Sequence, residues 1–176
     1  MSNNDSPTQE KRPARLRSVV SRLRDDRGVA LTEFALIAPL LMLLLFGMLD
    51  FGKAFNYWID ETHLANMGAR WAVVNKNPGS GGGQTLQQYI VAQADTNELR
   101  NGGTTSIPTA DKASAYICFP DGTGGVGHAV EVRVTATYHW LGFVSQKIGF
   151  LTTPIAGKAQ MRIEQTPSAY AADGAC

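Results

Sequence analysis

A single apolar run constrains what this chain can fold into. The 21 residues from Val29 to Leu49 contain one ionisable group, Glu33. A helix of that length spans about 31 Å, close to the ~30 Å thickness of a bilayer's hydrocarbon core. The alternative is a buried helix of a soluble bundle, but such helices seldom run this far without a polar stripe. The sequence therefore predicts a transmembrane helix over 29–49.

The charges that flank this run predict its orientation. Residues 1–28 carry seven Lys or Arg against four Asp or Glu, whereas Lys53 is the only basic residue among the twenty after Leu49. Positive charge is retained on the cytoplasmic side of a membrane. We therefore expect a single-pass protein of the cytoplasmic (inner) membrane, with a basic cytoplasmic leader over 1–28 and a periplasmic or extracytoplasmic domain over 50–176.

Two kinds of N-terminal segment other than a plain anchor need to be weighed. No small-x-small site follows the apolar run, so a signal peptide cleaved after the run is not expected. Within the leader, apolar residues at helical spacing among arginines favour a short amphipathic helix on anionic lipid, and a solvated disordered leader is the alternative.

The residues at the start of the apolar run form a recognisable sequence motif. Arg27 and Gly28 precede Val29, and Glu33 lies five residues beyond Gly28. Together with the basic leader, this resembles the processing site of type IV pilin-like proteins, in which a prepilin peptidase cuts after the Gly. The resemblance narrows to TadE-like pilus assembly proteins, the minor pseudopilins of tight-adherence (Flp-type) systems. It is carried by RGVALTEFALIAPLLMLLLFGMLDFGKAF and LANMGARWAVV, within residues 27–74.

The resemblance implies roles for five residues. Gly28 and Val29 would flank the processed bond. Glu33 and Phe34 would act in assembly, with Glu33 pairing with the free α-amino group of a neighbouring subunit. A carboxylate inside a bilayer costs on the order of a few kcal/mol unless it is paired. The alternative is a Glu33 that snorkels to the headgroups. Pro39 would bend or locally melt the helix during assembly, or be an ordinary kink.

The helix is expected to continue outside the membrane over 50–75. Asp60 and Glu61 are assigned to its polar surface, and a Pro and a Gly-rich stretch follow its end. A second, short helix over 85–98 begins at the capping box formed by Thr85 and Gln88. The apolar stripe of the long helix, suited to a partner surface, consists of Met48, Phe51, Phe55, Trp58, Leu64, Met67, Trp71 and Val74.

Three strands are expected near 114–119, 128–140 and 155–164. The second alternates apolar and polar residues, as in a sheet that buries one face and exposes the other. An antiparallel sheet covered by the long helix is the simplest arrangement. The predicted fold class is α+β: a long N-terminal transmembrane helix that extends into a pilin-like domain with a small antiparallel β-sheet.

The two cysteines, Cys118 and Cys176, both fall in the outer region, where oxidation is permitted. An intrachain disulfide would tie the C-terminus to the sheet. Cys176 could instead stay free or pair with a second chain, and the sequence leaves these alternatives open.

Catalytic and nucleic-acid-binding functions find no support in the sequence. The three histidines are far apart, and no nucleophile elbow, Walker loop, CxxC or EF-hand loop is present. We expect no enzyme, cofactor or metal site. The net charge of +1 hides an imbalance: the basic excess lies in the leader, and residues 29–176 hold nine Lys or Arg against eleven Asp or Glu, which argues against nucleic acid as a partner.

The sequence thus predicts a non-enzymatic, TadE-like minor pilin or pseudopilin. Its expected partners are membrane lipid, other pilin or pseudopilin subunits, the pilus assembly platform and a prepilin peptidase. The alternative is an uncleaved single-pass tether that presents a β-rich domain to a ligand or to the cell wall.

Overall fold

The computed structural model describes residues 15–102, 109–142, 151–174 and 176, with side chains from residue 28 onward. It divides the chain into two units, Met1–Leu45 and Phe46–Cys176. The described part of the first unit is helical, and the second unit contains the remaining helices and all three strands. The structure confirms the predicted α+β class, because a long apolar helix is followed by a small antiparallel sheet.

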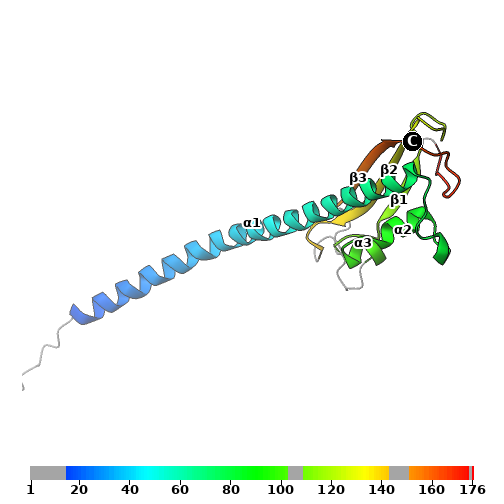
Figure 1. Cartoon of the computed structure of the whole chain (residues 1–176). Helices are drawn as coiled ribbons and strands as arrows, with labels where there is room; N and C mark the ends of the chain where they lie inside the picture. Colours follow the sequence, from blue (N-terminus) through cyan, green and yellow to red (C-terminus); the bar gives the residue numbers. More distant parts are fainter. Residues whose placement is uncertain (1–14, 103–108, 143–150, 175) are drawn as a thin grey trace, which may run out of the picture. The chain divides into compact units, whose positions relative to one another are not determined.

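Helix α1 runs from Arg15 to Val73 and remains helical through Pro39 (Figure 1). From Gly28 to Leu49 every residue is exposed except Ala38, which is half-buried. By length and composition, α1 is long and apolar enough to cross a membrane. Apolar side chains are not usually left this exposed to water over a continuous surface, so this surface suits lipid or another apolar helix.

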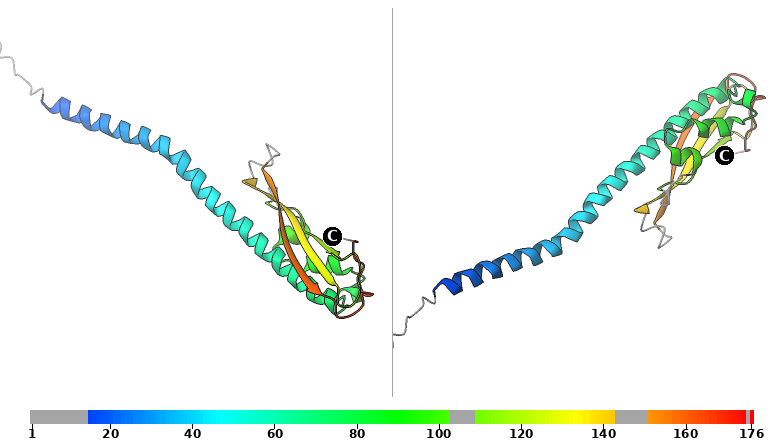
Figure 2. Two further views of the ribbon diagram at one scale, coloured as in Figure 1. Left: turned by 90° about the horizontal axis from the view of Figure 1, so that it is seen from above. Right: turned by 90° about the horizontal axis from the view of Figure 1, so that it is seen from below.

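The sheet contains β1 (Ser114–Cys118), β2 (Ala129–His139) and β3 (Thr152–Arg162), in the order β1-β2-β3. Both pairs are antiparallel, so β2 is the central strand (Figure 2). The alternation predicted for the second strand is confirmed for its apolar residues, but Glu131, expected on the exposed face, is also buried. The buried apolar residues are Val130, Val132, Val134, Ala136 and Tyr138.

Two short helices replace the single helix expected over 85–98. Helix α2 spans Leu86–Ala92 and α3 spans Asn97–Asn101; a 3-10 turn, η1 (Ser80–Gly82), precedes them. The predicted capping box of Thr85 and Gln88 is confirmed. The helix breaks after Ala92 because the backbone N–H of Asp95 donates to the Asp60 carboxylate at 3.0 Å, and Thr96 then caps α3.

The inner face of α1 differs from the predicted one. Asp60 and Glu61, expected on the polar surface, are buried, whereas Phe51, Phe55 and Trp58 of the expected apolar stripe are exposed. The helix turns its small residues toward the sheet, since these allow the two backbones to approach closely. The buried small residues of α1 are Ala54, Ala65, Gly68, Ala69 and Ala72.

Helix α1 approaches the sheet closely at Gly157 of β3. A Cβ placed on Gly157 would lie 2.3 Å from the carbonyl carbon of Glu61 and 2.3 Å from the amide nitrogen of Thr62. These contacts are with backbone, which cannot swing aside as a side chain can. Further along α1, a Cβ on Gly68 would lie 2.5 Å from Ile90 of α2 and 3.1 Å from Val132. The positions of the two glycines therefore set how closely α1 packs.

We expect Gly157→Ala to destabilise the outer domain by about 1–3 kcal/mol, the usual cost of inserting a methyl group where there is no room. Thermal unfolding of the full-length protein in detergent, followed by circular dichroism, measures the loss. Gly81→Ala is the matched control, because no described atom lies within 4 Å of its Cβ position. Equal melting temperatures for the two variants would contradict the close contact.

Candidate functional site

The predicted processing and assembly residues lie on one exposed stretch of α1. Gly28, Val29, Glu33, Phe34 and Pro39 are all exposed. The Glu33 carboxylate has no hydrogen-bond or ion-pair partner among the described residues, and its neighbours on the helix are apolar. A carboxylate in this setting can accept a cationic partner from outside the chain.

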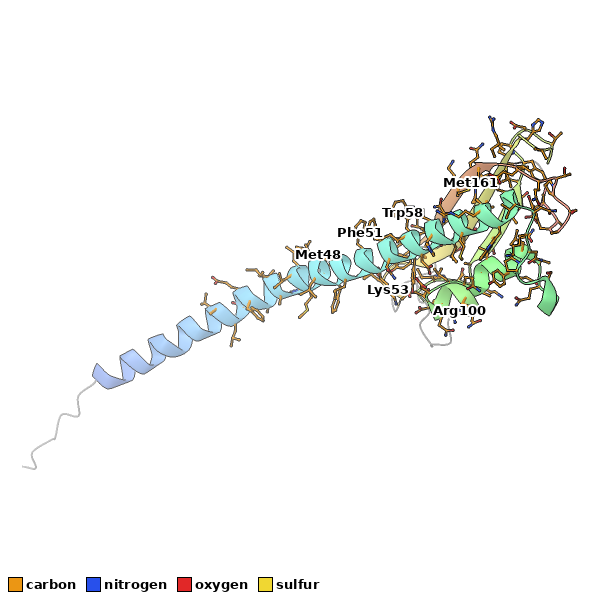
Figure 3. All side chains as sticks on the ribbon, in the orientation of Figure 1. Met48, Phe51, Lys53, Trp58, Arg100 and Met161 are labelled. Atoms are coloured by element: carbon orange, nitrogen blue, oxygen red, sulfur yellow. A yellow bond between two sulfur atoms is a disulfide. The ribbon has the colours of Figure 1, made fainter. Side chains whose placement is uncertain are left out.

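The exposed apolar surface continues past the predicted end of the span. Phe51 is 63% exposed and Trp58 is 46% exposed, and Phe55 packs beside Trp58 with ring centroids 5.5 Å apart. Figure 3 shows Met48, Phe51 and Trp58 projecting outward from α1. We call Met48, Phe51, Phe55, Trp58 and Ile59 the outer aromatic face; together they give α1 a large apolar surface that the domain itself leaves uncovered.

The opposite side of α1 is held to the sheet by Asp50. Its Oδ1 accepts a hydrogen bond from the Tyr138 hydroxyl at 2.6 Å, and its Oδ2 accepts one from the Leu141 amide at 2.7 Å. Burial of Tyr138 and the neighbouring Asp50 carboxylate raise the pKa of Tyr138, so this hydroxyl remains a donor. Asp50 thereby fixes the end of β2 to the helix at the point where the predicted span ends.

A second set of contacts joins α1 to α3. Lys53 lies 3.7 Å from the Glu98 carboxylate and 6.0 Å from the centre of the Tyr57 ring. The Tyr57 hydroxyl is 3.0 Å from the Thr109 hydroxyl, and burial raises the pKa of Tyr57 to about 12. These contacts orient the domain-facing side of α1 and leave the outer aromatic face free.

Glu61 is the most deeply buried ionisable group of the described chain and is fully inaccessible. Neither of its carboxylate oxygens has a hydrogen-bond partner among the described residues. Burial, reinforced by the negative charge of Asp60, raises the pKa of Glu61 to about 8. The nearby Ala136 backbone lowers the pKa of Glu61 in part, without forming a hydrogen bond to the carboxylate. Glu61 is therefore mostly protonated at neutral pH.

The C-terminal tail is attached to β1. Cys118 and Cys176 form a disulfide with a Cα–Cα distance of 5.2 Å, so the intrachain bridge is the alternative that the structure contains. The Ile117 amide donates to the Asp173 carboxylate at 2.9 Å, and the Asp173 amide donates to the Ile117 carbonyl at 2.7 Å. Glu131 lies near both sulfurs, but sulfurs bonded to one another are not available as metal ligands.

Two of these residues, Asp50 and Gly157, have a position in the sequence that indicates their role. Asp50 is the first ionisable residue after a long apolar run, a position at which a carboxylate can anchor a following domain. Glu61 carried no such signal, because an acid next to another acid ordinarily indicates a solvated surface. Gly157 sits alone inside an alternating strand, which is the usual mark of a close backbone approach.

Comparison with known proteins adds one finding to this geometry. Residues 28–70 match the family model described as TadE-like protein. This confirms the resemblance, and it indicates a membrane protein related to pilus assembly. The match covers the exposed half of α1 and the part that packs on the sheet, up to Arg70. No curated protein and no solved structure matches the chain.

The buried Glu61 predicts a specific dependence of stability on pH. An acid whose pKa rises from 4.5 to about 8 on folding binds more protons in the folded state between those values, so stability falls as pH rises through that window. We expect Glu61→Gln to raise stability at pH 9 by on the order of 3 kcal/mol and to change it little near pH 4.5. Melting temperatures at both pH values measure this, with the exposed Glu164→Gln as control. A gain of equal size at both pH values would contradict the prediction.

The disulfide predicts a redox-dependent stability. Reducing a bridge that closes 58 residues removes about 4 kcal/mol by the chain-entropy estimate. We expect no reactive thiol in protein isolated from the cell envelope, two after unfolding in reductant, and a lower melting temperature for Cys118→Ser with Cys176→Ser. Labelling with a maleimide, with and without reductant, counts the thiols. Two freely reactive thiols before reduction would rule out the bridge.

Proposed function

We propose that this chain is a minor pilin or pseudopilin that takes part in assembling a tight-adherence-type pilus or secretion filament. The observation that carries the proposal is the segment that matches the TadE-like model. It is an exposed apolar helix whose single ionisable side chain within the predicted span, Glu33, has no partner among the described residues. Lipid can solvate such a helix before assembly, and apolar helices of other subunits can cover it afterwards. The chain acts by packing, without catalysis.

Processing after Gly28 is part of this proposal. Gly28 is exposed, and apart from its chain neighbours and the local helix backbone no described atom lies within 4 Å of the position of a Cβ on it. Cleavage would remove the basic leader and leave an α-amino group at Val29. That charge offsets the desolvation of Glu33 when the two meet between subunits, and the pair would set the axial register of neighbouring helices.

The proposal places the chain in the inner membrane, with its N-terminus in the cytoplasm and the outer domain periplasmic or extracytoplasmic. The excess of basic residues before the span supports this orientation. The partners are membrane lipid, other pilin or pseudopilin subunits, the assembly platform and the prepilin peptidase. The outer aromatic face extends the packing surface beyond the bilayer, where Phe51 and Trp58 can contact a neighbouring helix.

Processing and assembly can be tested together. We expect N-terminal sequencing of the mature protein to begin at Val29. We also expect Glu33→Gln to insert into the membrane normally while its incorporation into the filament falls by roughly tenfold or more, because the variant leaves the partner's charge unpaired. Membrane fractionation and quantitative blotting of sheared filaments measure the two steps.

Thr32→Ala is the matched control for Glu33→Gln, because Thr32 donates its hydrogen bond within its own helix, to the Val29 carbonyl. This variant should assemble normally. Unchanged incorporation of Glu33→Gln would remove the assigned role of Glu33. An intact Met1 in cells with an active prepilin peptidase would instead support an uncleaved tether whose outer domain binds a ligand or the cell wall.

A further inference from the structure

A groove of about 620 Å³ lies beside β1, between that strand and helices α2 and α3. Its apolar floor includes Val91, Ala92 and Ala113, and Arg100 and Lys112 supply positive charge. No Asp or Glu lines it. Its polar lining is otherwise uncharged: Gln84, Gln87, Gln88, Asn101 and Ser114.

The strand that borders this groove is an edge strand with a free stretch of backbone. Ala113, Ile117 and Phe119 direct their amides away from β2, to Leu99, Asp173 and Gly174 respectively. In an antiparallel pair, residues bonded to the neighbouring strand alternate with residues that face outward. Ala115 lies midway between Ala113 and Ile117 in this alternation. Its N–H and C=O therefore also face away from β2, on the side of the groove that it lines.

The chain already uses the neighbouring part of this edge to bind an extended segment that carries one aspartate, Asp173. Asp173 of the C-terminal tail exchanges hydrogen bonds with Ile117 through its own amide and its carboxylate. The tail continues to Gly174, whose carbonyl accepts from Phe119. The tail leaves the stretch at Ala115 uncovered. Gln87, another lining residue, donates its side-chain N–H to the Ala171 carbonyl of the tail at 2.8 Å, and its side-chain oxygen is buried without a hydrogen-bond partner among the described residues.

We propose that this groove binds an extended, acidic segment of a different protein, which adds a short strand to β1 at Ala115. Backbone hydrogen bonds to Ala115 would hold the segment, and Arg100 and Lys112 would select for carboxylate side chains. Arg100 is held in place by two hydrogen bonds to the Ala94 carbonyl, at 3.1 and 2.6 Å. Figure 3 shows Arg100 on α3. No ion-pair partner of Lys112 occurs among the described residues.

The described part of a second copy offers no free, extended acidic segment. The carboxylates in the described part of the outer domain are mostly engaged: Asp50 with Tyr138, Glu98 with Lys53, Asp111 with His139, Asp121 with His128, Glu131 with Arg133, and Asp173 with Ile117. Asp95 lies in the turn between two helices and Glu164 lies at a bend, so neither belongs to a free extended segment.

Peptide binding tests the proposal without depending on pilus assembly. The probe is fluorescein-labelled Asp-Thr-Val-Thr-Val-Thr-Asp amide, with a counterpart that has Lys in place of both Asp. Fluorescence anisotropy is measured against full-length protein in detergent micelles. We expect saturable binding of the acidic peptide with a Kd below about 1 mM, and at least roughly tenfold weaker binding of the basic one.

Three variants separate the backbone contribution from the charge contribution. Ala115→Pro removes the outward N–H but leaves the bonds between β1 and β2, so binding should be lost; Ala115→Val keeps the N–H and should bind. Lys112→Glu should weaken binding about tenfold, and Lys158→Glu, on the opposite edge strand, should leave it unchanged. Melting temperatures check that each variant is folded.

Several outcomes would overturn the proposal. They are the absence of saturable binding by folded wild-type protein, equal binding of the two peptides, or equal effects of Lys112→Glu and Lys158→Glu. Self-association that Ala115→Pro abolishes would also overturn it, by assigning the groove to a second copy. If Ala115→Pro does not fold, Lys112→Glu and the basic peptide still decide the result.

Discussion

The outer domain depends on how closely α1 approaches the sheet. A three-stranded sheet buries one face only if something covers it. Here the cover is the C-terminal part of α1, and residues 29–49 of the same helix are apolar and mostly exposed. Small residues on α1 and Gly157 on β3 allow the two backbones to meet. This contact also accounts for the protonated state of Glu61, because a carboxyl group at so close an interface is out of reach of water and of compensating charge.

The inward and outward faces of α1 divide the functions of the domain. The inward face is fully used, by Asp50 at the end of β2, by the Tyr57 and Lys53 contacts, and by the buried core. The outward face keeps Phe51, Phe55 and Trp58 exposed, although each could have been buried had the helix rotated. Retaining large aromatics outside while small residues pack inside gives up apolar burial within the domain, which is consistent with a surface reserved for another helix or for lipid.

The sequence predicted the elements whose signals are periodic, and it failed where tertiary contacts decide. The apolar run, the alternation along β2 and the capping box at Thr85 were each readable, because one local pattern determines each of them. The buried face of α1 could not be predicted from the sequence. Spacing and hydrophobicity favour Trp58 over Ala54 as a core residue, whereas the close approach of Gly157 to α1 favours small residues on the buried face. The break between α2 and α3 depends on Asp60, more than thirty residues earlier, so no local pattern could show it. The positions of Gly28 and Glu33 follow from the sequence, whereas their roles depend on partners outside the chain.

The two edges of the sheet show why the groove beside β1 is unusual. A free strand edge invites pairing with other chains, and proteins protect such edges with proline, charge or a covering segment. The outer strand β3 carries Pro154, Lys158 and Arg162. Thr137, which lies opposite Pro154, accepts a hydrogen bond from Asp111 on the β1 side of β2, so the Pro154 nitrogen faces the free edge of β3 and offers it no N–H. On the β1 side, the disulfide-tied tail bonds to Ile117 and Phe119, and no bond from the described tail residues reaches the Ala115 backbone. A nearby lysine would be enough to discourage pairing with neutral or basic strands, yet it would favour an acidic one. The proposed binding edge at Ala115 would therefore select for acidic strands at a sheet whose other edge is protected.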